Sequence, residues 1–232
     1  MVLIGVDGCP GGWYAVQADR GNAITGCVYP RFVDLLAGAA EGAIVAVDIP
    51  IGLHSIGSRA CDIAARRALA PRRSSSVFPA PLRPMLGKAT HAEASAVRRA
   101  IEGKGMSIQS FAITKKVHEV DLALASLPEH ESRVYEVHPE VSFTQMNGGQ
   151  PMSFAKKKAA GRAERAELLA RTFGAAPNRL LAERDRALVG ADDVLDALVS
   201  LWSAMRVKQG TAESLPAIPE ADEYGRRMAI FY

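Results

Sequence analysis

The stretch IGVDGCPGGWYA, residues 4–15, decides the fold because it holds the end of one buried strand and the start of the next. Ile4 and Val6 are apolar, and a carboxylate, Asp7, follows them directly. A Gly-Cys-Pro-Gly-Gly turn then leads to apolar Trp13. The stretch predicts a hairpin whose first strand ends in an acid, although Asp is a poor strand former and costly to bury without a partner.

The chain around this hairpin continues the same sheet. Apolar runs predict three antiparallel strands, at residues 2–7, 12–18 and 22–29, with a turn at 19–22. The run AIVAVDIPIGL (43–53) predicts a further buried strand, and it repeats the first arrangement because Asp48 follows an apolar run and precedes a proline turn. Both acids also have a purely structural explanation, since an Asp at the end of a strand can cap a turn by accepting hydrogen bonds from backbone amides.

The remainder of the chain alternates helices with one more strand. The stretch RVYEVHPEVSF (133–143) reads as a strand with Glu136 inside it, while the prolines of 71–84 predict a loop. Apolar periodicity predicts helices at 32–40, 58–70, 89–103, 108–126, 156–174 and 190–210. The expected fold class is therefore α/β, a mixed sheet covered by helices, with an inserted helical segment at about 54–130.

Composition is that of one globular domain of 232 residues, with 48% hydrophobic and 23% charged residues. A net charge of +3 is compatible with a polyanionic partner but does not establish one. The 3 cysteines have no CxxC spacing, which argues against a disulfide framework or a zinc site and fits the cytoplasm. No apolar run approaches the roughly 18 residues that a membrane span needs, so we expect no membrane association.

A late helix carries two further acids. In GADDVLDALVSLWSAMR, Asp193 and Asp196 are three residues apart and share one helix face. Most other positions of this helix are apolar, so its polar face must meet water or a site. Acids in a first helical turn also interact favourably with the helix dipole, which is the simpler explanation. Glu136 likewise points either to solvent or into the same site.

Carboxylates that converge repel one another, and a divalent cation neutralises them. Hard oxygen ligands favour Mg²⁺ or Mn²⁺ over Zn²⁺. Such a centre can clamp the oxygens of a phosphodiester. The catalytic candidates are Asp7, Asp48, Glu136, Asp193 and Asp196, and the residues expected to hold the metal are Asp7, Asp48 and Asp193.

Basic and hydroxyl side chains supply candidates for substrate binding. Arg72 and Arg73 stand beside three serines, Ser75 among them, a combination that can grip phosphate. Lys116 precedes VHEVD and is a further candidate. An ordinary polar loop and a solvated helix face explain these residues equally simply. Whether Glu119, Asp121 or Glu140 completes the site stays open at this point.

The whole chain resembles uncharacterised bacterial and archaeal proteins described as predicted nucleases with an RNase H-like fold. The matching stretches are GVDGCPGGW, VDIPIGL, RACDIAAR, SSVFPAP, KKVHEVD, YEVHPEVSF, NGGQP and DDVLDAL. The resemblance implies a single RNase H-like domain with a five-stranded mixed sheet, in which three antiparallel strands come first. It implies acids on the first strand, on the fourth strand and at the start of a late helix, and Asp7, Asp48 and Asp193 fall on those places. DDVLDAL also resembles the late helix of Holliday-junction resolvases, with Asp193 and Asp196 as the final ligands.

The resulting hypothesis is a Mg²⁺- or Mn²⁺-dependent nuclease, a hydrolase of nucleic-acid phosphodiester bonds, with RNA and DNA both open as substrate. Two alternatives remain. One is an ATP-binding phosphotransferase-like protein of the same fold, and the other is a non-catalytic nucleic-acid-binding module. The sequence leaves the oligomeric state open, a homodimer included.

Overall fold

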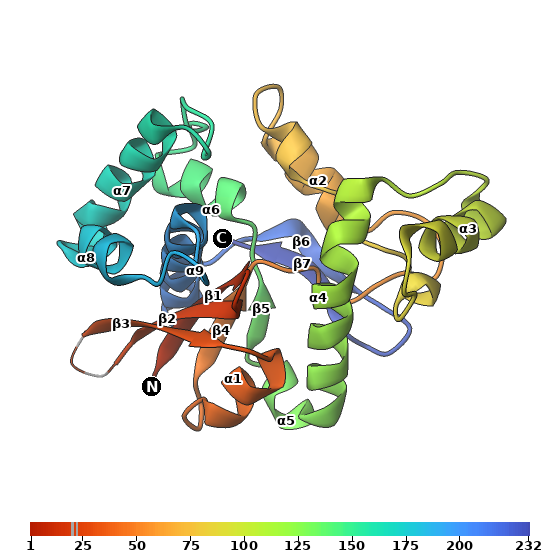
Figure 1. Ribbon diagram of the computed structural model, residues 1–232, viewed down its shortest axis with the longest axis horizontal. Helices are drawn as coiled ribbons and strands as arrows, with labels where there is room; N and C mark the ends of the chain where they lie inside the picture. The colour runs from red at the N-terminus through yellow and green to blue at the C-terminus, as the bar shows by residue number, and fades with distance from the viewer. Residues whose placement is uncertain (20, 22) are drawn as a thin grey trace.

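The computed structural model describes residues 1–19, 21 and 23–232, and its centre is a mixed sheet (Figure 1). Among these residues the sheet has five strands in the order β3-β2-β1-β4-β5. The strands are β1 (Leu3–Cys9), β2 (Gly12–Ala18), β3 (Ile24–Tyr29), β4 (Ile44–Val47) and β5 (Val134–Glu136). The first three form an antiparallel meander, whereas β4 pairs in parallel with β1 and with β5. The expected α/β class is confirmed; Arg20 and Asn22, in the expected turn at 19–22, lie outside the described residues.

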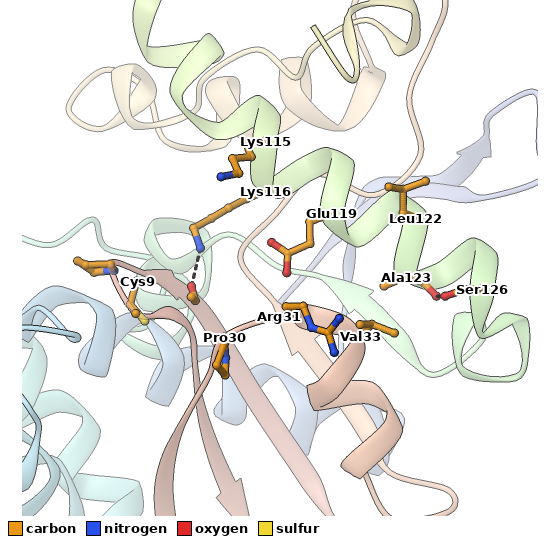
Figure 2. A pocket seen from close by; sticks show the side chains of 13 residues that line it. Cys9, Pro30, Arg31, Val33, Lys115, Lys116, Glu119, Leu122, Ala123 and Ser126 are labelled. Atoms are coloured by element: carbon orange, nitrogen blue, oxygen red, sulfur yellow. Dashed lines mark hydrogen bonds between the residues drawn. The ribbon is translucent and has the colours of Figure 1, made fainter. Parts of the chain in front are cut away.

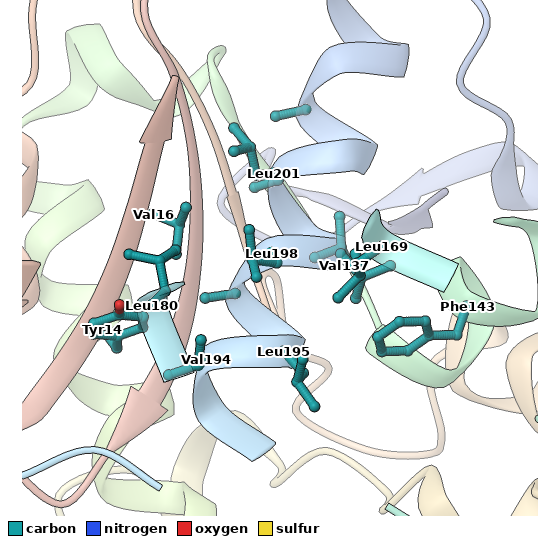
Figure 3. Close-up of a cluster of buried hydrophobic side chains, with 14 of the residues drawn as sticks. Tyr14, Val16, Val137, Phe143, Leu169, Leu180, Val194, Leu195, Leu198 and Leu201 are labelled. Atoms are coloured by element: carbon teal, nitrogen blue, oxygen red, sulfur yellow. The ribbon is translucent and has the colours of Figure 1, made fainter. Parts of the chain in front are cut away.

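One face of the sheet is covered by the long helix α9 (Ala191–Gln209), which crosses β1 directly. Leu198 and Leu201 of α9 belong to a buried apolar cluster with Val16 of β2 (Figure 3). The close approach depends on Gly5, because a Cβ there would lie 2.0 Å from the backbone nitrogen of Leu201. The helices packed against α9 are α6 (Pro139–Met146), α7 (Ala159–Phe173) and α8 (Ala176–Glu183).

The opposite face of the sheet packs against α1 (Phe32–Gly38) and α4 (Ile108–Ser126). The rings of Trp13 and Phe32 meet edge to face, with centroids 5.0 Å apart. Val117 and Val120 of α4 lie in the same apolar cluster. The central strands β1, β2 and β4 are therefore buried on both faces, as their near-continuous apolar runs predict, whereas the edge strand β3 is largely exposed.

A helical segment separates β4 from β5 in the chain, as expected, and Figure 1 shows α2, α3 and α4 together on one side of the molecule. Its elements are α2 (Ala60–Ala68), the 3₁₀ helices Ser74–Ser76 and Arg83–Met85, α3 (His91–Glu102), α4 and α5 (Pro128–Glu131). Helix α3 begins at a capping box, in which the Thr90 hydroxyl accepts the backbone N–H of Glu93.

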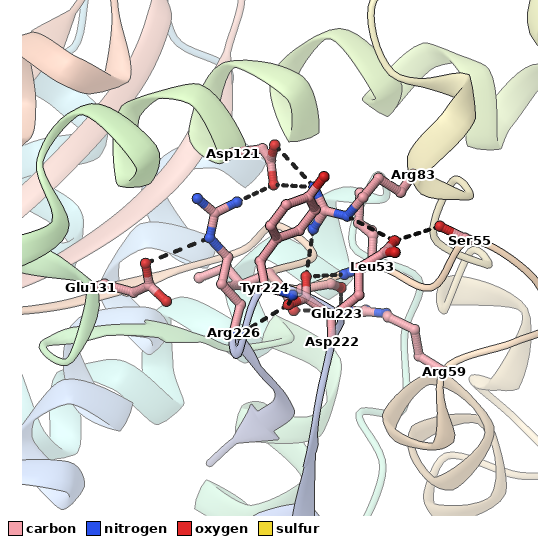
Figure 4. A network of polar contacts seen from close by, with 12 residues as sticks. Leu53, Ser55, Arg59, Arg83, Asp121, Glu131, Asp222, Glu223, Tyr224 and Arg226 are labelled. Atoms are coloured by element: carbon pink, nitrogen blue, oxygen red, sulfur yellow. Dashed lines mark hydrogen bonds and ion pairs between the residues drawn. The ribbon is translucent and has the colours of Figure 1, made fainter.

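The C-terminal residues form a second, two-stranded sheet of β6 (Ser214–Ala221) and β7 (Arg227–Phe231). A parallel bridge from Phe231 to Val137 joins it to the chain just after β5. A polar network locks this hairpin to α4: Arg83 and Arg226 both pair with Asp121, and Arg83 also pairs with Asp222 (Figure 4). The hairpin is thus fixed against both the main sheet and the helical segment.

Several expected elements are wrong in extent. The expected strand at 133–143 ends at Glu136, and α6 begins at Pro139, because proline is favoured at the first position of a helix. The expected strand at 43–53 is regular only over Ile44–Val47. Helix α8 and the β6–β7 hairpin were not among the expected elements. None of the helices in the described residues is both long and apolar enough to span a membrane.

Candidate active site

Asp7 and Asp48 lie at the carboxyl ends of two neighbouring parallel strands. The backbone N–H of Asp48, one residue past β4, donates to the carbonyl oxygen of Val6 at 3.0 Å, so the two acids come from adjacent backbone. Side chains alternate between the faces of a sheet. This alternation places both acids on the face of Gly5 and Ala46, which is the face that α9 covers.

Helix α9 brings a third carboxylate, that of Asp196, to the same place. Gly5 lets α9 lie directly on β1, and one helical turn from Leu201 towards the start of α9 reaches the level of Asp7. The Asp196 side chain is only 1% exposed. Three acids that are far apart in sequence therefore lie at one end of the central strands, near enough for Asp48 and Asp196 to raise the pKa of Asp7.

The charges of these acids act on one another. Burial raises the pKa of Asp7 well above its usual range, and the carboxylates of Asp48 and Asp196 raise it further. Burial raises the pKa of Asp48 to about 6, with His138 opposing the shift and Asp196 adding to it. Burial also raises the pKa of Asp196, against the lowering effect of Lys156. Carboxylates that resist ionisation inside a cleft are typical of functional sites.

Lys156 provides a positive charge within this group. Its Nζ donates to Oδ2 of Asp196 at 2.7 Å, and its own side chain is 38% exposed. The pKa of Lys156 is raised, mainly by the Asp196 carboxylate. The other oxygen of Asp196, Oδ1, is buried without a hydrogen-bond partner among the described residues.

A cavity of about 610 Å³ opens over the acids. Lys156 is one of the described residues that line this cavity, and Asp196 is not. The lysine therefore lies between Asp196 and the cavity. The cavity is lined by acidic residues, Asp7 and Asp48 among them, and by basic residues, of which we call five the basic rim: Arg72, Arg73, Lys116, Lys156 and Lys157. A cavity lined by both acidic and basic side chains suits a cation and a phosphate together.

Glu140 is a further acid in the wall of this cavity. One of its oxygens accepts a bond of 2.6 Å from Arg165, which is itself fully buried. The other, Oε2, lies 4.0 Å from Nε of Arg73 and has no hydrogen-bond partner among the described residues. The structure thus brings Glu140 to the site, whereas Glu119 and Asp121 have other partners.

Asp193 stabilises the start of its own helix, as expected for an acid in a first helical turn. Its Oδ2 accepts the backbone N–H of Gly190 at 2.8 Å, which caps the start of α9. Burial raises the pKa of Asp193, and the bond from Gly190 lowers it. Its charge still contributes to the raised pKa of Asp7. Asp193 therefore lies at the margin of the acidic group, with one oxygen committed to its own helix.

Glu136 lies on the other face of the sheet from Asp48. It pairs with Arg59 through two bonds of 2.7 Å, and Arg59 also pairs with Asp62 at 2.5 Å. Cys61, Asp62 and Glu136 are the one group in the described residues whose three ligand atoms all lie within 4.8 Å of one another. The Arg59 guanidinium already bonds to both carboxylates, Asp62 and Glu136, so the group reads as a structural ion cluster rather than a metal site, although these three residues also line the cavity.

All four residues expected to bind substrate line the cavity that holds Asp7 and Asp48: Arg72, Arg73, Ser75 and Lys116. Arg73 is held in place by a 2.8 Å bond to the carbonyl oxygen of Met152. Lys116 donates to the Gly12 carbonyl oxygen and lies 4.4 Å from the centre of the Trp13 ring. Burial lowers the pKa of Lys116.

A second cavity, of about 890 Å³, lies between the β1–β2 turn and α4 (Figure 2). Lys116 lines both cavities. Glu119 faces this second space, but its Oε1 accepts bonds from the Trp13 indole and the Phe32 backbone N–H. Those bonds hold α4 against the hairpin and α1, so Glu119 has a structural task here.

Sequence reasoning left Glu140 open as a member of the site and did not select Lys156. Glu140 carried a usable signal, because Pro-Glu after a strand marks the first turn of a helix. The sequence carried no signal for Lys156, because the three consecutive lysines 156–158 are alike. Only the packing of the loop places the first of them against Asp196.

Comparison with known proteins bears on the family rather than on the activity. No curated protein and no solved structure matches the chain. A family model described as "Protein of unknown function (DUF429)" matches residues 5–221. Since this match spans most of the chain and includes the strands and the helix that carry the acids, the protein belongs to the DUF429 family.

Proposed function

We propose that this protein is a divalent-metal-dependent phosphodiesterase that hydrolyses nucleic acid in the cytoplasm. The observation that carries the proposal is the proximity of half-buried Asp7 and Asp48 to buried Asp196: burial raises the pKa of all three, and the Asp196 carboxylate raises those of Asp7 and Asp48 further. Such an arrangement costs stability in the absence of a cation. A cation at Asp7 and Asp48 would reverse that cost.

The donor set fits Mg²⁺ or Mn²⁺. Mg²⁺ is commonly bound through one or two carboxylates, with water and substrate phosphates as the other ligands. Asp7 and Asp48 supply two carboxylates that face the cavity. A bound divalent cation would polarise a phosphoryl oxygen. Asp193 is a weaker candidate than the sequence indicates, because one of its oxygens caps α9.

The basic rim supports a polyanionic substrate. Arg72, Arg73 and Lys116 line the same cavity as the acids. Guanidinium and ammonium groups bind phosphate oxygens and position a nucleic-acid backbone without reading its sequence. His138 also lines the cavity, and its Nδ1 is buried without a hydrogen-bond partner among the described residues.

The resemblance to RNase H-like proteins adds support of a different kind. It implies an antiparallel meander followed by parallel strands, with acids on the first and fourth strands. The strand order β3-β2-β1-β4-β5 and the positions of Asp7 and Asp48 agree with that expectation.

The test is cleavage of labelled single- and double-stranded RNA and DNA in the presence of Mn²⁺. We expect Asp7→Asn and Asp48→Asn to lose at least about 100-fold in rate, since even groups that only support metal ligands cost 10–100-fold. Asp34→Asn is the matched control, because it removes the same charge from an exposed position on α1. It should cleave as the wild type does.

Two other results would redirect the assignment. Binding of nucleic acid with no cleavage, and no difference between wild type and Asp7→Asn, would favour a non-catalytic binding module. Calorimetric binding of ATP without cleavage would favour a phosphotransferase-like protein.

A further inference from the structure

Lys156 lies between the most deeply buried acid and the cavity. Its Nζ is 2.7 Å from Oδ2 of Asp196, whose side chain is 1% exposed. Lys156 belongs to the wall of the cavity, and its side chain is 38% exposed. The ammonium group therefore covers Asp196 and still borders the space that a substrate would enter.

The charge of Lys156 acts on the whole acidic group. It lowers the pKa of Asp7, of Asp48 and of Asp196, in each case opposing burial. In return these three carboxylates raise the pKa of Lys156, Asp196 most strongly. A lysine on a solvated surface run would not interact with three buried acids in this way.

The loop that carries Lys156 is held firmly against α7. The backbone N–H groups of Ser153 and Phe154 donate to the two oxygens of Glu164, at 2.7 and 3.0 Å. The Phe154 carbonyl oxygen accepts a bond from Arg165 at 3.1 Å. Gly161 makes room for the loop, because a Cβ there would lie 2.1 Å from the carbonyl oxygen of Ala155. The position of the ammonium group is thus built into the fold.

We propose that Lys156 takes the place of one of the two cations that this group of carboxylates would otherwise bind. The centre then holds a single divalent cation, at Asp7 and Asp48, beside a permanent ammonium at Asp196. This inference rests on the proposed function, in which Asp7 and Asp48 hold Mg²⁺ or Mn²⁺.

Two buried oxygens support the idea of a second cation position. Oδ1 of Asp196 and Oε2 of Glu140 are both buried without a hydrogen-bond partner among the described residues. Glu140 is close enough to raise the pKa of Asp196. These oxygens are suited to a hard cation once the ammonium group is removed. In the wild type, the bond to Asp196 uses one of the three N–H donors of Lys156, and the other donors remain to bind a phosphate oxygen.

The experiment counts bound Mn²⁺ in the full-length protein by calorimetry, with free Mn²⁺ followed by electron paramagnetic resonance. We expect the wild type to bind one Mn²⁺ and Lys156→Met to bind a second. Lys157→Met is the matched control, since Lys157 also lines the cavity but is exposed and follows directly in sequence. It should bind one Mn²⁺, as the wild type does.

Thermal melting provides a readout that does not depend on activity. In EDTA, Lys156→Met should melt at a lower temperature than the wild type, because Asp196 is left buried without a partner. Mn²⁺ should raise the melting temperature of Lys156→Met more than that of the wild type, since two bound ions stabilise more than one.

A second variant keeps the inference testable if Lys156→Met does not fold. Asp196→Asn should still bind one Mn²⁺ with wild-type affinity, because Asp196 is committed to Lys156, whereas Asp48→Asn should lose the ion. Two ions in the wild type, or loss of the ion in Asp196→Asn, would overturn the inference alone. One ion in the wild type with no cleavage of any nucleic acid would overturn the proposed function and leave the role of Lys156 standing. No ion in either wild type or Lys156→Met would overturn both.

Discussion

Two groups of buried acids lie at the same ends of neighbouring strands, and they differ in what neutralises them. Glu136, at the end of β5, pairs with Val47 in the strand register, one residue before Asp48. Glu136 receives two bonds from the Arg59 guanidinium. Asp7, Asp48 and Glu136 all line the same cavity, and burial raises the pKa of each, but among the described residues no arginine or lysine pairs with Asp7 or Asp48. One step along the strands therefore separates acids that pair with a fixed guanidinium from acids that have no arginine or lysine partner among the described residues.

The difference shows that burial alone does not identify a functional carboxylate. Because side chains alternate across a sheet, Glu136 points to the face of Val134, where α2 delivers Arg59. Asp48 points to the opposite face, where α9 delivers another acid. In the first group a fixed cation offsets part of the cost of burying the carboxylates, and in the second group a cation would have to come from outside the chain.

The largest effect is expected from Arg59→Met. This change leaves Glu136 and Asp62 buried without a cation, and breaking such a pair costs about 3–5 kcal/mol in the free energy of unfolding. Urea denaturation measures the loss. Arg67→Met, at an exposed position of the same helix, should change it by less than about 0.5 kcal/mol. If Arg59→Met and Arg67→Met lowered the free energy of unfolding equally, Arg59 would not be needed to hold Glu136 and Asp62 in the folded protein.

The acidic centre should reveal itself in the pH dependence of stability. The pKa of Asp48 is about 6 in the folded protein against an ordinary 3.8, so the folded state holds this proton more tightly than the unfolded state does. Ionising Asp48 as the pH rises through this window therefore costs stability, by up to about 3 kcal/mol at about 1.36 kcal/mol per pKa unit. Asp48→Asn avoids that cost.

Unfolding of wild type and Asp48→Asn in EDTA, at about pH 4 and about pH 8, checks this prediction. The variant should gain on the wild type as the pH rises. A constant difference between the two proteins at both pH values would contradict the raised pKa of Asp48.

Added Mn²⁺ should separate the two acidic groups. At about 100 times its dissociation constant, Mn²⁺ should stabilise the wild type by about 2.7 kcal/mol. Thermal melting should show this stabilisation lost in Asp7→Asn and kept in Glu136→Gln, although the second variant is less stable at the outset. If Mn²⁺ stabilised Asp7→Asn but not Glu136→Gln, the metal would bind at the Glu136 group and not at Asp7 and Asp48.

The smallest effect is expected at the basic rim. Arg72→Ala should weaken binding of single-stranded nucleic acid to a similar extent for all sequences, and should reduce the slope of log K against log salt by about 0.7. Fluorescence anisotropy at several salt concentrations measures that slope. Arg67→Ala, whose side chain is exposed and outside the cavity wall, serves as control and should leave the slope unchanged.

Much of the sheet follows from local sequence, because hydrophobic runs and turn residues act over a few positions. The meander of β1 to β3 and the strand before Asp48 are examples. Local reading failed at RVYEVHPEVSF (133–143), where the three strand residues Val134–Glu136 are followed by a helix that begins at Pro139. An apolar stretch fits either structure, and the proline marks the boundary only once the helix is recognised.

The candidate site divides in the same way. Asp7 and Asp48 can be identified from sequence, since burying an acid at the end of an apolar strand costs free energy unless the acid has a partner or a function. Glu136 looks equivalent by the same rule and is not, because Arg59, 77 residues away in sequence, satisfies it. No local pattern contains that information.

By itself, the sequence of this DUF429 protein determined the α/β class, the meander and the two strand-end acids, because these depend on hydrophobic periodicity and on turns of a few residues. Only the tertiary structure decided which acids share a centre and which of them meet a fixed cation. Gly5 lets α9 carry Asp196 to Asp7, and Gly161 lets a loop place Lys156 on Asp196. Both are close approaches between segments distant in the chain, and electrostatic partners are set by distance in space rather than by spacing in sequence.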